Sequence, residues 1–164
     1  IRSTQEPVGY VYSSGLRGFI GAPFQTPVSV STLDEMLLVL RKSSGLQFDE
    51  QLPGFHLYGT DICLEAHARG LRNYVLPCFA FHNSNGVRWL PMDFWKAYLY
   101  LRKKWKERLP VTTPCTRITS GCMPICMDVI RRLISKARGK MNPGCRVQNP
   151  ELFYNEYILP RRKT

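Results

Sequence analysis

Residues Gly54–Gly70 read GFHLYGTDICLEAHARG. Thr60 or Asp61 is a natural N-cap for a short helix, Glu65 suits the positive end of that helix, and Gly70 suits the position just past its last turn. The stretch therefore predicts a short helix that begins after a turn rich in aromatic residues. An acid at a helix start can simply cap the helix, or it can be a reactive group held where the chain turns.

The charge of the chain is concentrated in its second half. The 164 residues carry a net charge of +11, yet residues 1–90 hold seven Lys/Arg and seven Asp/Glu, whereas residues 91–164 hold sixteen and five. Such a field indicates an anionic partner at this end, for example an anionic membrane surface or an acidic protein. Binding to nucleic acid would need a recognisable module, and the terminal LPRRKT is not one, so we expect no nucleic-acid partner.

The composition predicts one globular domain. Hydrophobic residues make up 44% of the chain and aromatic residues 12%, and its length allows a sizeable core. The six cysteines show no regular framework, and neither a signal peptide nor an apolar run of about 18 residues is visible. We therefore expect a cytoplasmic protein with reduced thiols, peripheral to the inner face of a membrane where it meets anionic lipid.

The periodicity of the chain predicts an α/β order. Strand signals are followed by the short helix, a further strand and two basic amphipathic helices. The second of these helices is expected to turn Ile125, Val129, Leu133, Ile134 and Ala137 inward, and the tail from Gly139 is expected to be loosely ordered. We expect strands at 8–15, 35–42 and 71–81 and a turn at 82–86. The two helices are expected to run from Pro91 to about Arg108 and from Pro124 to about Arg138.

Four segments in order carry a resemblance to a known family: LDEMLLVLRKSSGLQFDE (33–50), GFHLYGTDICLEAHARG (54–70), FHNSNG (81–86) and RKKWKERLP (102–110). Together they resemble the C-terminal half of a family-two-type glycosyltransferase with the GT-A fold, closest to the streptomycin-biosynthesis-type subgroup. The resemblance covers roughly residues 20–118. It implies a mixed sheet flanked by helices over 1–118, the acceptor side of the enzyme, followed by a basic helical appendage over 119–164.

The resemblance also implies a reaction and its partners. Such enzymes transfer a sugar from a nucleotide-sugar donor to a carbohydrate, lipid-linked or peptide-linked acceptor, usually with a divalent cation, Mn or Mg. In that family an Asp-x-Asp motif in the preceding donor half holds the metal and the diphosphate. No Asp-x-Asp occurs in this chain, and its first residue is Ile. We therefore expect an N-terminally truncated chain that shares its cation with the missing half and is inactive alone.

Asp61 is the candidate catalytic residue. In an inverting transfer a carboxylate takes the proton of the acceptor hydroxyl as its oxygen attacks the anomeric carbon. In many family members this stretch has the sequence Glu-Asp-x-Asp, and the first Asp is the base. If the second Asp is aligned with Asp61, Gly59 falls at the position of the base. Asp61 is therefore either the base, acting from the neighbouring position, or a residue that caps the helix and organises the acceptor pocket.

His82, Asn83 and Ser84 follow the strand at 71–81. The resemblance implies that His82 is a metal ligand or a contact of the donor diphosphate, and a neutral imidazole suits a divalent ion such as Mn. Asn83 and Ser84 would contact phosphates or fix the loop. The alternative for His82 is a hydrogen bond within the turn.

Four further residues are candidates for the acceptor pocket. Asp34 and Glu35 resemble the acids that such enzymes place at the pocket wall, and the alternative is a solvated turn. His56 and Tyr58 could stack on a sugar or bond to it, although alternating aromatic residues more often pack. A second hypothesis treats the whole chain as a non-catalytic basic module that docks on an anionic membrane surface or an acidic partner.

Overall fold

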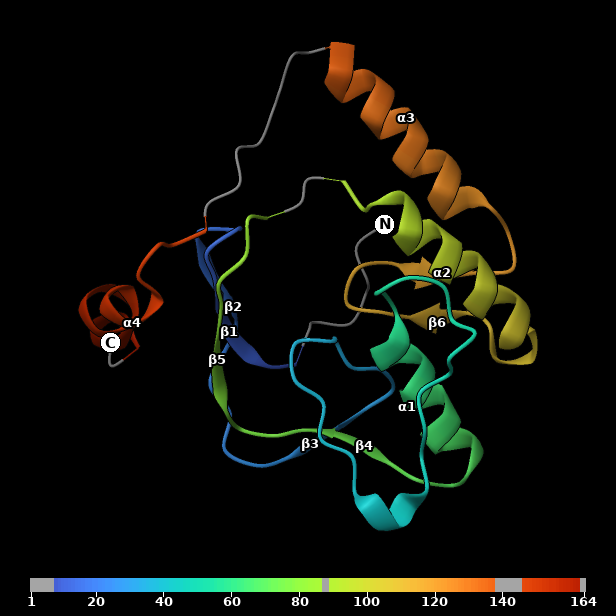
Figure 1. Ribbon diagram of the computed structural model, residues 1–164, viewed down its shortest axis with the longest axis horizontal. Helices are drawn as coiled ribbons and strands as arrows, with labels where there is room; N and C mark the ends of the chain where they lie inside the picture. Colours follow the sequence, from blue (N-terminus) through green and yellow to red (C-terminus); the bar gives the residue numbers. More distant parts are fainter. Residues whose placement is uncertain (1–7, 87–88, 138–145, 163–164) are drawn as a thin grey trace. The chain divides into compact units, whose positions relative to one another are not determined.

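A computed structural model describes residues 8–86, 89–137 and 146–162 (Figure 1). The chain forms two compact units, and each is described by itself below. Unit 1 takes in Ile1–Glu6, Val28–Val75 and Trp89–Gly139, and unit 2 takes in Pro7–Pro27, Leu76–Arg88 and Lys140–Thr164. Segments distant in sequence assemble within each unit, so this grouping differs from a division after residue 118.

Unit 1 contains most of the helices. Its elements are β3 Val28–Val30, η1 Lys42–Ser44, α1 Tyr58–Ala68, β4 Asn73–Val75, α2 Met92–Lys104, η2 Lys106–Arg108, β6 Val111–Thr112, β7 Arg117–Ile118 and α3 Met123–Ala137. β3 and β4 pair antiparallel, as do β6 and β7. In Figure 1, α1 and α2 lie next to the β6–β7 hairpin, and the core of the unit forms between these elements.

The core of unit 1 depends on the apolar stripe of α2. Tyr98 and Leu101 are completely buried, and Phe94 is 2% exposed. They pack against Leu64 of α1 and Val111 of β6. The helical spacing of these α2 residues is the pattern that the sequence shows, and Pro91 lies just outside the helix as its N-cap rather than inside it.

The helix predicted from residues 54–70 is confirmed, with an earlier start. It begins at Tyr58 after Leu57, whose left-handed backbone (φ +63°) turns the chain and whose side chain is buried. The prediction that Thr60 or Asp61 is the N-cap is therefore wrong, because both residues lie inside the first turn of the helix. The expected C-terminal glycine is right: Gly70 has φ +73°, and the N–H groups of Gly70 and Leu71 donate to the carbonyls of His67 and Ala66.

The strand expected at 35–42 does not form. Residues 37–41 are in neither helix nor strand, and among the described residues no strand pairs with them. Burial nevertheless alternates along this segment: Leu38 and Leu40 are half-buried, whereas Leu37 is 77% and Val39 84% exposed. The apolar residues thus keep a period of two without the hydrogen-bonded neighbour that defines a strand.

α3 confirms the predicted helix, but its apolar face is largely exposed. Ile125 packs against the core of unit 1, as expected, whereas Val129, Leu133 and Ile134 are 48%, 64% and 48% exposed. The expectation that these three residues point inward is wrong, because the contacts that hold α3 come from its first half and from Arg132, which donates to the carbonyl of Leu90. The side chain of Ala137 lies outside the described residues.

Unit 2 is built on a mixed three-stranded sheet in the order β2-β1-β5. β1 Tyr10–Ser13 pairs antiparallel with β2 Gly18–Gly21 and parallel with β5 Phe79–His82. The single strand expected at 71–81 is therefore two strands, β4 and β5, which belong to different units. Pro77 lies between them and offers no N–H for a continuous ladder.

A C-terminal helix belongs to unit 2. Residues 150–161 form α4 Pro150–Phe153, a π-helical turn η3 Tyr154–Ile158, and α5 Leu159–Arg161. Phe153 and Tyr157 stack on each other with ring centroids 4.8 Å apart, and Tyr12 of the sheet contacts both rings. This aromatic packing orders a segment that we expected to be loose, and the first part of the expected tail, 139–145, lies outside the described residues.

The described residues thus combine helices with three small sheets, in agreement with the mixed α/β composition predicted from the sequence. Within these residues no helix has both the length and the apolar character needed to cross a membrane.

Candidate functional site

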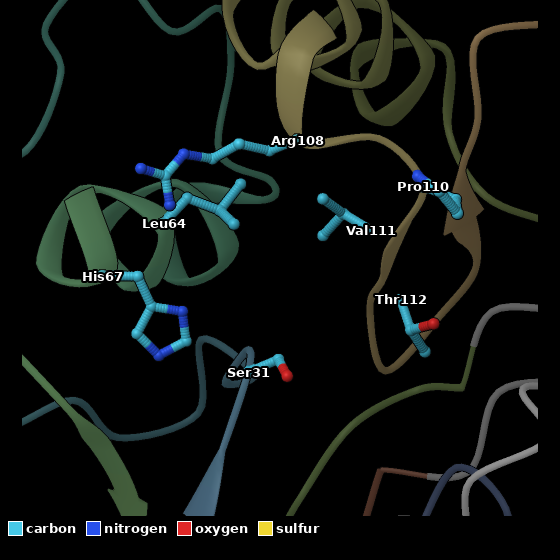
Figure 2. Close-up of a pocket in the computed structure, with 7 residues that line it drawn as sticks. All are labelled: Ser31, Leu64, His67, Arg108, Pro110, Val111 and Thr112. Atoms are coloured by element: carbon cyan, nitrogen blue, oxygen red, sulfur yellow. The ribbon is translucent and has the colours of Figure 1, made fainter.

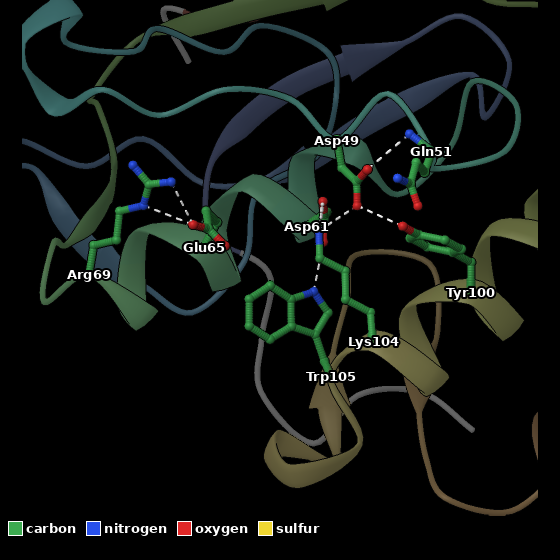
Figure 3. A network of polar contacts seen from close by, with 8 residues as sticks. All are labelled: Asp49, Gln51, Asp61, Glu65, Arg69, Tyr100, Lys104 and Trp105. Carbon is green, nitrogen blue, oxygen red and sulfur yellow. Dashed lines mark hydrogen bonds and ion pairs between the residues drawn. The ribbon is translucent and has the colours of Figure 1, made fainter.

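The candidate Asp61 lies in the first turn of α1, with its side chain only 5% exposed. One carboxylate oxygen accepts a hydrogen bond from the indole Nε1 of Trp105 at 2.7 Å, and the other accepts from the Nζ of Lys104 at 2.9 Å (Figure 3). Both oxygens are therefore engaged by the end of α2. This arrangement favours the second alternative for Asp61, a residue that organises the structure around it.

Lys104 joins Asp61 to a second acid (Figure 3). Its Nζ lies 2.6 Å from the carboxylate of Asp49, which also accepts from the hydroxyl of Tyr100 at 2.8 Å. The hydrogen bond from Lys104 lowers the pKa of Asp49. Burial works against the charge of Lys104, but its hydrogen bonds to Asp49 and Asp61 outweigh burial and raise its pKa. The network ties α1 and α2 to the loop at 49.

Asp34 and Glu35 meet the start of α1. The backbone N–H of Gly59 donates to the carboxylate of Glu35 at 3.3 Å, and the hydroxyl of Tyr58 donates to the Glu35 carbonyl at 3.2 Å. Burial, together with the charge of Asp34, raises the pKa of Glu35 to about 7. Burial and the same two acids also raise the pKa of Tyr58. The structure thus brings together three of the expected residues, Asp34, Glu35 and Tyr58.

Position 59 leaves no space for a side chain. A Cβ added at Gly59 would lie 2.9 Å from the carbonyl oxygen of Leu33 and 3.4 Å from backbone atoms of Asp34. The segment 33–35 therefore packs directly on the helix at the point where an acid is expected from the family resemblance. The carboxylate of Glu35 instead lies next to this position, 3.3 Å from the backbone nitrogen of Gly59.

His56 lies apart from these polar contacts. Its half-buried ring packs edge-on against Phe94 at a centroid separation of 5.8 Å. This placement agrees with the packing alternative for His56. The rings of Phe48 and Phe55 contact the ring of Tyr58, with centroid separations of 5.6 and 5.3 Å.

His82, Asn83 and Ser84 belong to unit 2, whereas Asp61 belongs to unit 1. His82 ends β5 with an exposed side chain, and its carbonyl accepts from the backbone N–H of Ser14 at 3.1 Å. The Asn83 amide pairs with the backbone of Val147 through two hydrogen bonds of 2.8 and 3.0 Å. The backbone N–H of Ser84 donates to the Ser14 hydroxyl, which in turn donates to the carbonyl of Ser84. Asn83 and Ser84 therefore hold the turn in place.

A divalent cation has no ready-made site in the described ranges, where no three His, Cys, Asp or Glu side chains gather closely enough to hold a metal ion. Among the described residues, His82 would therefore be a single ligand, and the cation shared with a preceding half stays a prediction.

The residues that engage Asp61 were not expected from the sequence as parts of a site. Lys104 and Trp105 lie 43 and 44 positions further along the chain. The sequence indicates packing for Trp105 and a solvated position for Lys104, and no spacing rule links either of them to an acid on another helix.

Comparison with known proteins leaves the family open. No protein-family model matches the chain, and no solved structure matches it. A curated protein from Fuscovulum blasticum, described as "ATP synthase subunits region ORF 6", is 33% identical over 61 residues, which cover 37% of this chain. The match spans 24% of the length of that relative.

Proposed function

We propose that this chain is the acceptor-side part of a glycosyltransferase that moves a sugar from a nucleotide-sugar donor to a hydroxyl group of a carbohydrate, lipid-linked or peptide-linked acceptor. The sequence resemblance over residues 20–118 supports the reaction class. The observation that carries the proposal is the position of Glu35, whose carboxylate lies 3.3 Å from the backbone nitrogen of Gly59.

Glu35, rather than Asp61, is the proposed base. A general base works best when its pKa is close to the operating pH, and the pKa of Glu35 is raised to about 7 by burial and by Asp34. In an inverting transfer the acceptor oxygen bonds to the anomeric carbon, and the bond from that carbon to the diphosphate breaks. The electron pair leaves with the nucleoside diphosphate, and the hydroxyl proton passes to Glu35.

The surroundings of Glu35 suit this role. The Gly59 N–H donates to one carboxylate oxygen of Glu35, and the same carboxyl group also has a side-chain hydrogen bond with Asp34. Tyr58 lies beside Glu35, with its hydroxyl donating to the carbonyl of that residue. In this proposal Asp61 and Lys104 fix α1 against α2 and so keep Gly59 and Tyr58 in position.

The proposal does not place the donor or the divalent cation, Mn or Mg, and the expected role of His82 as a metal ligand stays a separate prediction. The cation would neutralise charge on the departing diphosphate. No step above depends on it. The cytoplasmic location expected from the sequence remains part of the proposal.

The test measures release of nucleoside diphosphate from nucleotide-sugars by the protein that contains this chain, in the presence of Mn. Glu35→Gln keeps the size of the side chain and its hydrogen bond to Gly59 but cannot take a proton, so kcat is expected to fall about 100-fold or more while KM changes little. Glu50→Gln is the matched control, because Glu50 is an exposed acid of the same type.

The outcomes separate the function from the residue assignment. Turnover that survives in Glu35→Gln means that another group takes the proton, although sugar transfer stands. Absence of turnover with every nucleotide-sugar in the unaltered protein contradicts the transferase proposal itself.

A second candidate function, docking on an anionic membrane surface, is favoured by α3. Met123, Val129, Ile130, Leu133 and Ile134 are all 48–64% exposed on this helix. Arg131 is also exposed, and the chain continues with Lys136, Arg138 and Lys140. An apolar row with basic neighbours suits the boundary between acidic headgroups and acyl chains.

Vesicle flotation tests the second candidate. The protein is expected to float with vesicles of phosphatidylcholine and phosphatidylserine but not with phosphatidylcholine alone, and added salt should weaken binding. Leu133→Glu should reduce binding about tenfold or more, because it removes an inserted apolar side chain. Leu16→Glu, at a leucine that is 68% exposed in unit 2, is the control. Equal loss in both variants would argue against docking through α3.

A further inference from the structure

Sulfur-bearing side chains gather at the start of α3. Residues 122–127 read CMPICM, with cysteines at 122 and 126 and methionines at 123 and 127. By contrast, the residues that line the pocket between α1 and the segment 108–112 include neither cysteine nor methionine (Figure 2). Thiolate and thioether groups are the ligands that soft metal ions prefer, and the proposed sugar transfer uses none of these residues.

The two cysteines of this cluster are one helical turn apart. The backbone N–H of Cys126 donates to the carbonyl of Cys122 at 3.0 Å, as in an α-helix. Residues at this spacing are neighbours on a helix, with Cβ atoms about 5–6 Å apart. Both cysteines are exposed free thiols. Rotation about their Cα–Cβ bonds can therefore bring both sulfur atoms to one ion between them, at metal–sulfur distances of about 2.3 Å.

Met123 adds a thioether beside the two thiols. It lies three positions before Cys126, a spacing that also makes side chains neighbours on a helix. Its side chain is 62% exposed, so an ion from solvent can reach it. The unbranched methionine side chain is flexible and adapts to a ligand that is already held by other groups. Met123 therefore suits the role of a third, weaker sulfur ligand.

Arg102 of α2 supplies positive charge at this cluster. Its Nη1 lies 3.0 Å from the sulfur atom of Cys122. The two helices lie side by side in unit 1 (Figure 1), and a hydrogen bond of 3.1 Å from Trp95 to Asp128 also joins them. A monovalent ion bound by two thiolates carries a net negative charge. A guanidinium beside one of the sulfur atoms therefore stabilises the loaded site.

The surroundings of the cluster favour a soft monovalent ion over a hard divalent one. The acid of α3, Asp128, already accepts from Trp95 and from Arg132, the latter at 2.6 Å. In the part of the chain that the structure describes, no three His, Cys, Asp or Glu side chains gather closely enough to hold a metal ion. A structural zinc site needs four ligands, whereas Cu(I) is satisfied by two or three sulfur atoms.

We propose that Cys122 and Cys126 bind a monovalent copper ion, Cu(I), with Met123 as a third and weaker ligand. Each thiol gives up its proton as its sulfur bonds to the ion, and no electron is transferred. The inference rests neither on sugar transfer nor on membrane docking, since it concerns the side chains at the start of α3 alone.

The test is an oxygen-free titration of the reduced full chain with Cu(I) held by the coloured chelator bicinchoninate. The protein is expected to withdraw one ion per chain, and the loss of colour measures its affinity. Cys122→Ser and Cys126→Ser should each weaken binding about 100-fold or more, because a thiolate ligand is lost. Arg102→Gln should weaken it about tenfold, because the neighbouring charge is lost. Met123→Leu should weaken it as well, and an unchanged affinity would remove Met123 from the site.

Cys78→Ser is the matched control, because Cys78 is an exposed cysteine of unit 2. It should leave the affinity unchanged, as should Cys145→Ser. Circular dichroism shows whether each variant keeps its fold. Equal weakening by either control would assign the copper to other thiols and overturn the proposal. An affinity that survives in Cys126→Ser would leave a single thiol and contradict the paired site.

Two further measurements identify the ion and its ligands. X-ray absorption at the copper edge is expected to show sulfur neighbours alone, and nitrogen or oxygen neighbours in their place would contradict the site. Zn²⁺ is expected not to displace the bound Cu(I), because two thiolates leave its tetrahedral shell incomplete. Displacement by equimolar Zn²⁺ would contradict the choice of a monovalent ion.

Discussion

The carboxyl group of Glu35 is subject to opposing influences. Burial and the adjacent charge of Asp34 favour the protonated form, whereas the hydrogen bond from Gly59 favours the charged form. The first two prevail and raise the pKa to about 7 from its ordinary value of 4.5. An ionised Glu35 is therefore a cost to the folded state at neutral pH, as is common for groups that serve in proton transfer.

This balance predicts how stability depends on pH. Between pH 4.5 and 7 the folded protein holds a proton on Glu35 that the unfolded chain has released, so the stabilisation is complete below that window and is lost as the pH rises through it. The loss amounts to at most about 3 kcal/mol. Urea unfolding at pH 5 and pH 8 measures it. Glu35→Gln should abolish this part of the pH dependence, and an unchanged slope in the variant would contradict the assignment.

Thr60 offers a second residue-level prediction. Its hydroxyl is buried, and within the described residues it has no hydrogen-bond partner. Thr60→Val removes an unsatisfied polar atom and keeps the shape of the side chain, so the free energy of unfolding should rise by about 1 kcal/mol.

Thr113→Val is the matched control for this prediction. Thr113 is also buried, but its hydroxyl donates to the Thr116 carbonyl at 2.8 Å and accepts from the Thr116 N–H at 3.0 Å. The variant should lose about 1–2 kcal/mol. Chemical denaturation of both variants gives the comparison, and a loss of stability in Thr60→Val would show that its hydroxyl has a partner.

At the scale of single residues, the sequence drew attention to Asp61 and Glu35 but did not predict what these side chains contact. Asp61 stood out because it lies at a helix start, and it proved to be a buried acid with two strong partners. Its partners come from the end of another helix, and no rule based on local sequence predicts a contact between side chains of two helices. Glu35 was expected at a pocket wall, but its approach to Gly59 depends on how the segment 33–35 packs on α1.

Among the elements, the turn after β1 and the loop after β5 meet at two glycines. A Cβ on Gly15 would lie 2.3 Å from the backbone nitrogen of Gly86, and Gly86 itself has φ +64°. The two loops can approach this closely because neither residue has a side chain. The contact lies beside the hydrogen bonds that tie Ser14 to Ser84.

Gly15→Ala should therefore destabilise unit 2. The added methyl group would meet backbone atoms that cannot move independently, at a cost of about 1–3 kcal/mol. Gly18→Ala serves as the control, because a Cβ there would meet one atom at 3.9 Å. Thermal unfolding followed by circular dichroism compares the two. Similar melting temperatures would mean that the loops can separate at little cost.

Local signals predicted the elements that depend on local causes. The end of α1 at Gly70 follows from the conformational freedom of glycine, and α2 and α3 follow from helical spacing. The helix over 150–161 was missed, because it gains order from aromatic packing on the β1 sheet rather than from its own composition. Pro77 in the run 71–81 was the available sign that this run contains two strands.

At the scale of the whole molecule, the grouping of the chain into two units could not be predicted from the sequence. β1 pairs with β5 across more than sixty residues, and the helix at 150–161 joins the same unit. Such pairing depends on tertiary contacts, whereas the change in charge at residue 90 follows the sequence alone. Charge and fold therefore divide the chain at different places.

Thiol labelling reports on the stability of unit 1. Cys63 in α1 is 1% exposed, and burial raises its pKa to about 11, so it should react only when the protein unfolds. Cys78 and Cys126 are exposed and should react at once. Labelling with iodoacetamide followed by peptide mass spectrometry distinguishes these sites. Rapid modification of Cys63 in the native protein would show that α1 opens locally.

The segment 37–40 has a consequence for the behaviour of the protein in concentrated solution. Its backbone makes no hydrogen bond to another segment in the part of the chain that the structure describes, and Leu37 and Val39 face outward. A second copy could align beside it and form the missing ladder, as happens at unprotected sheet edges. A lysine at position 39 would discourage such association, much as natural proteins protect exposed edges with charge.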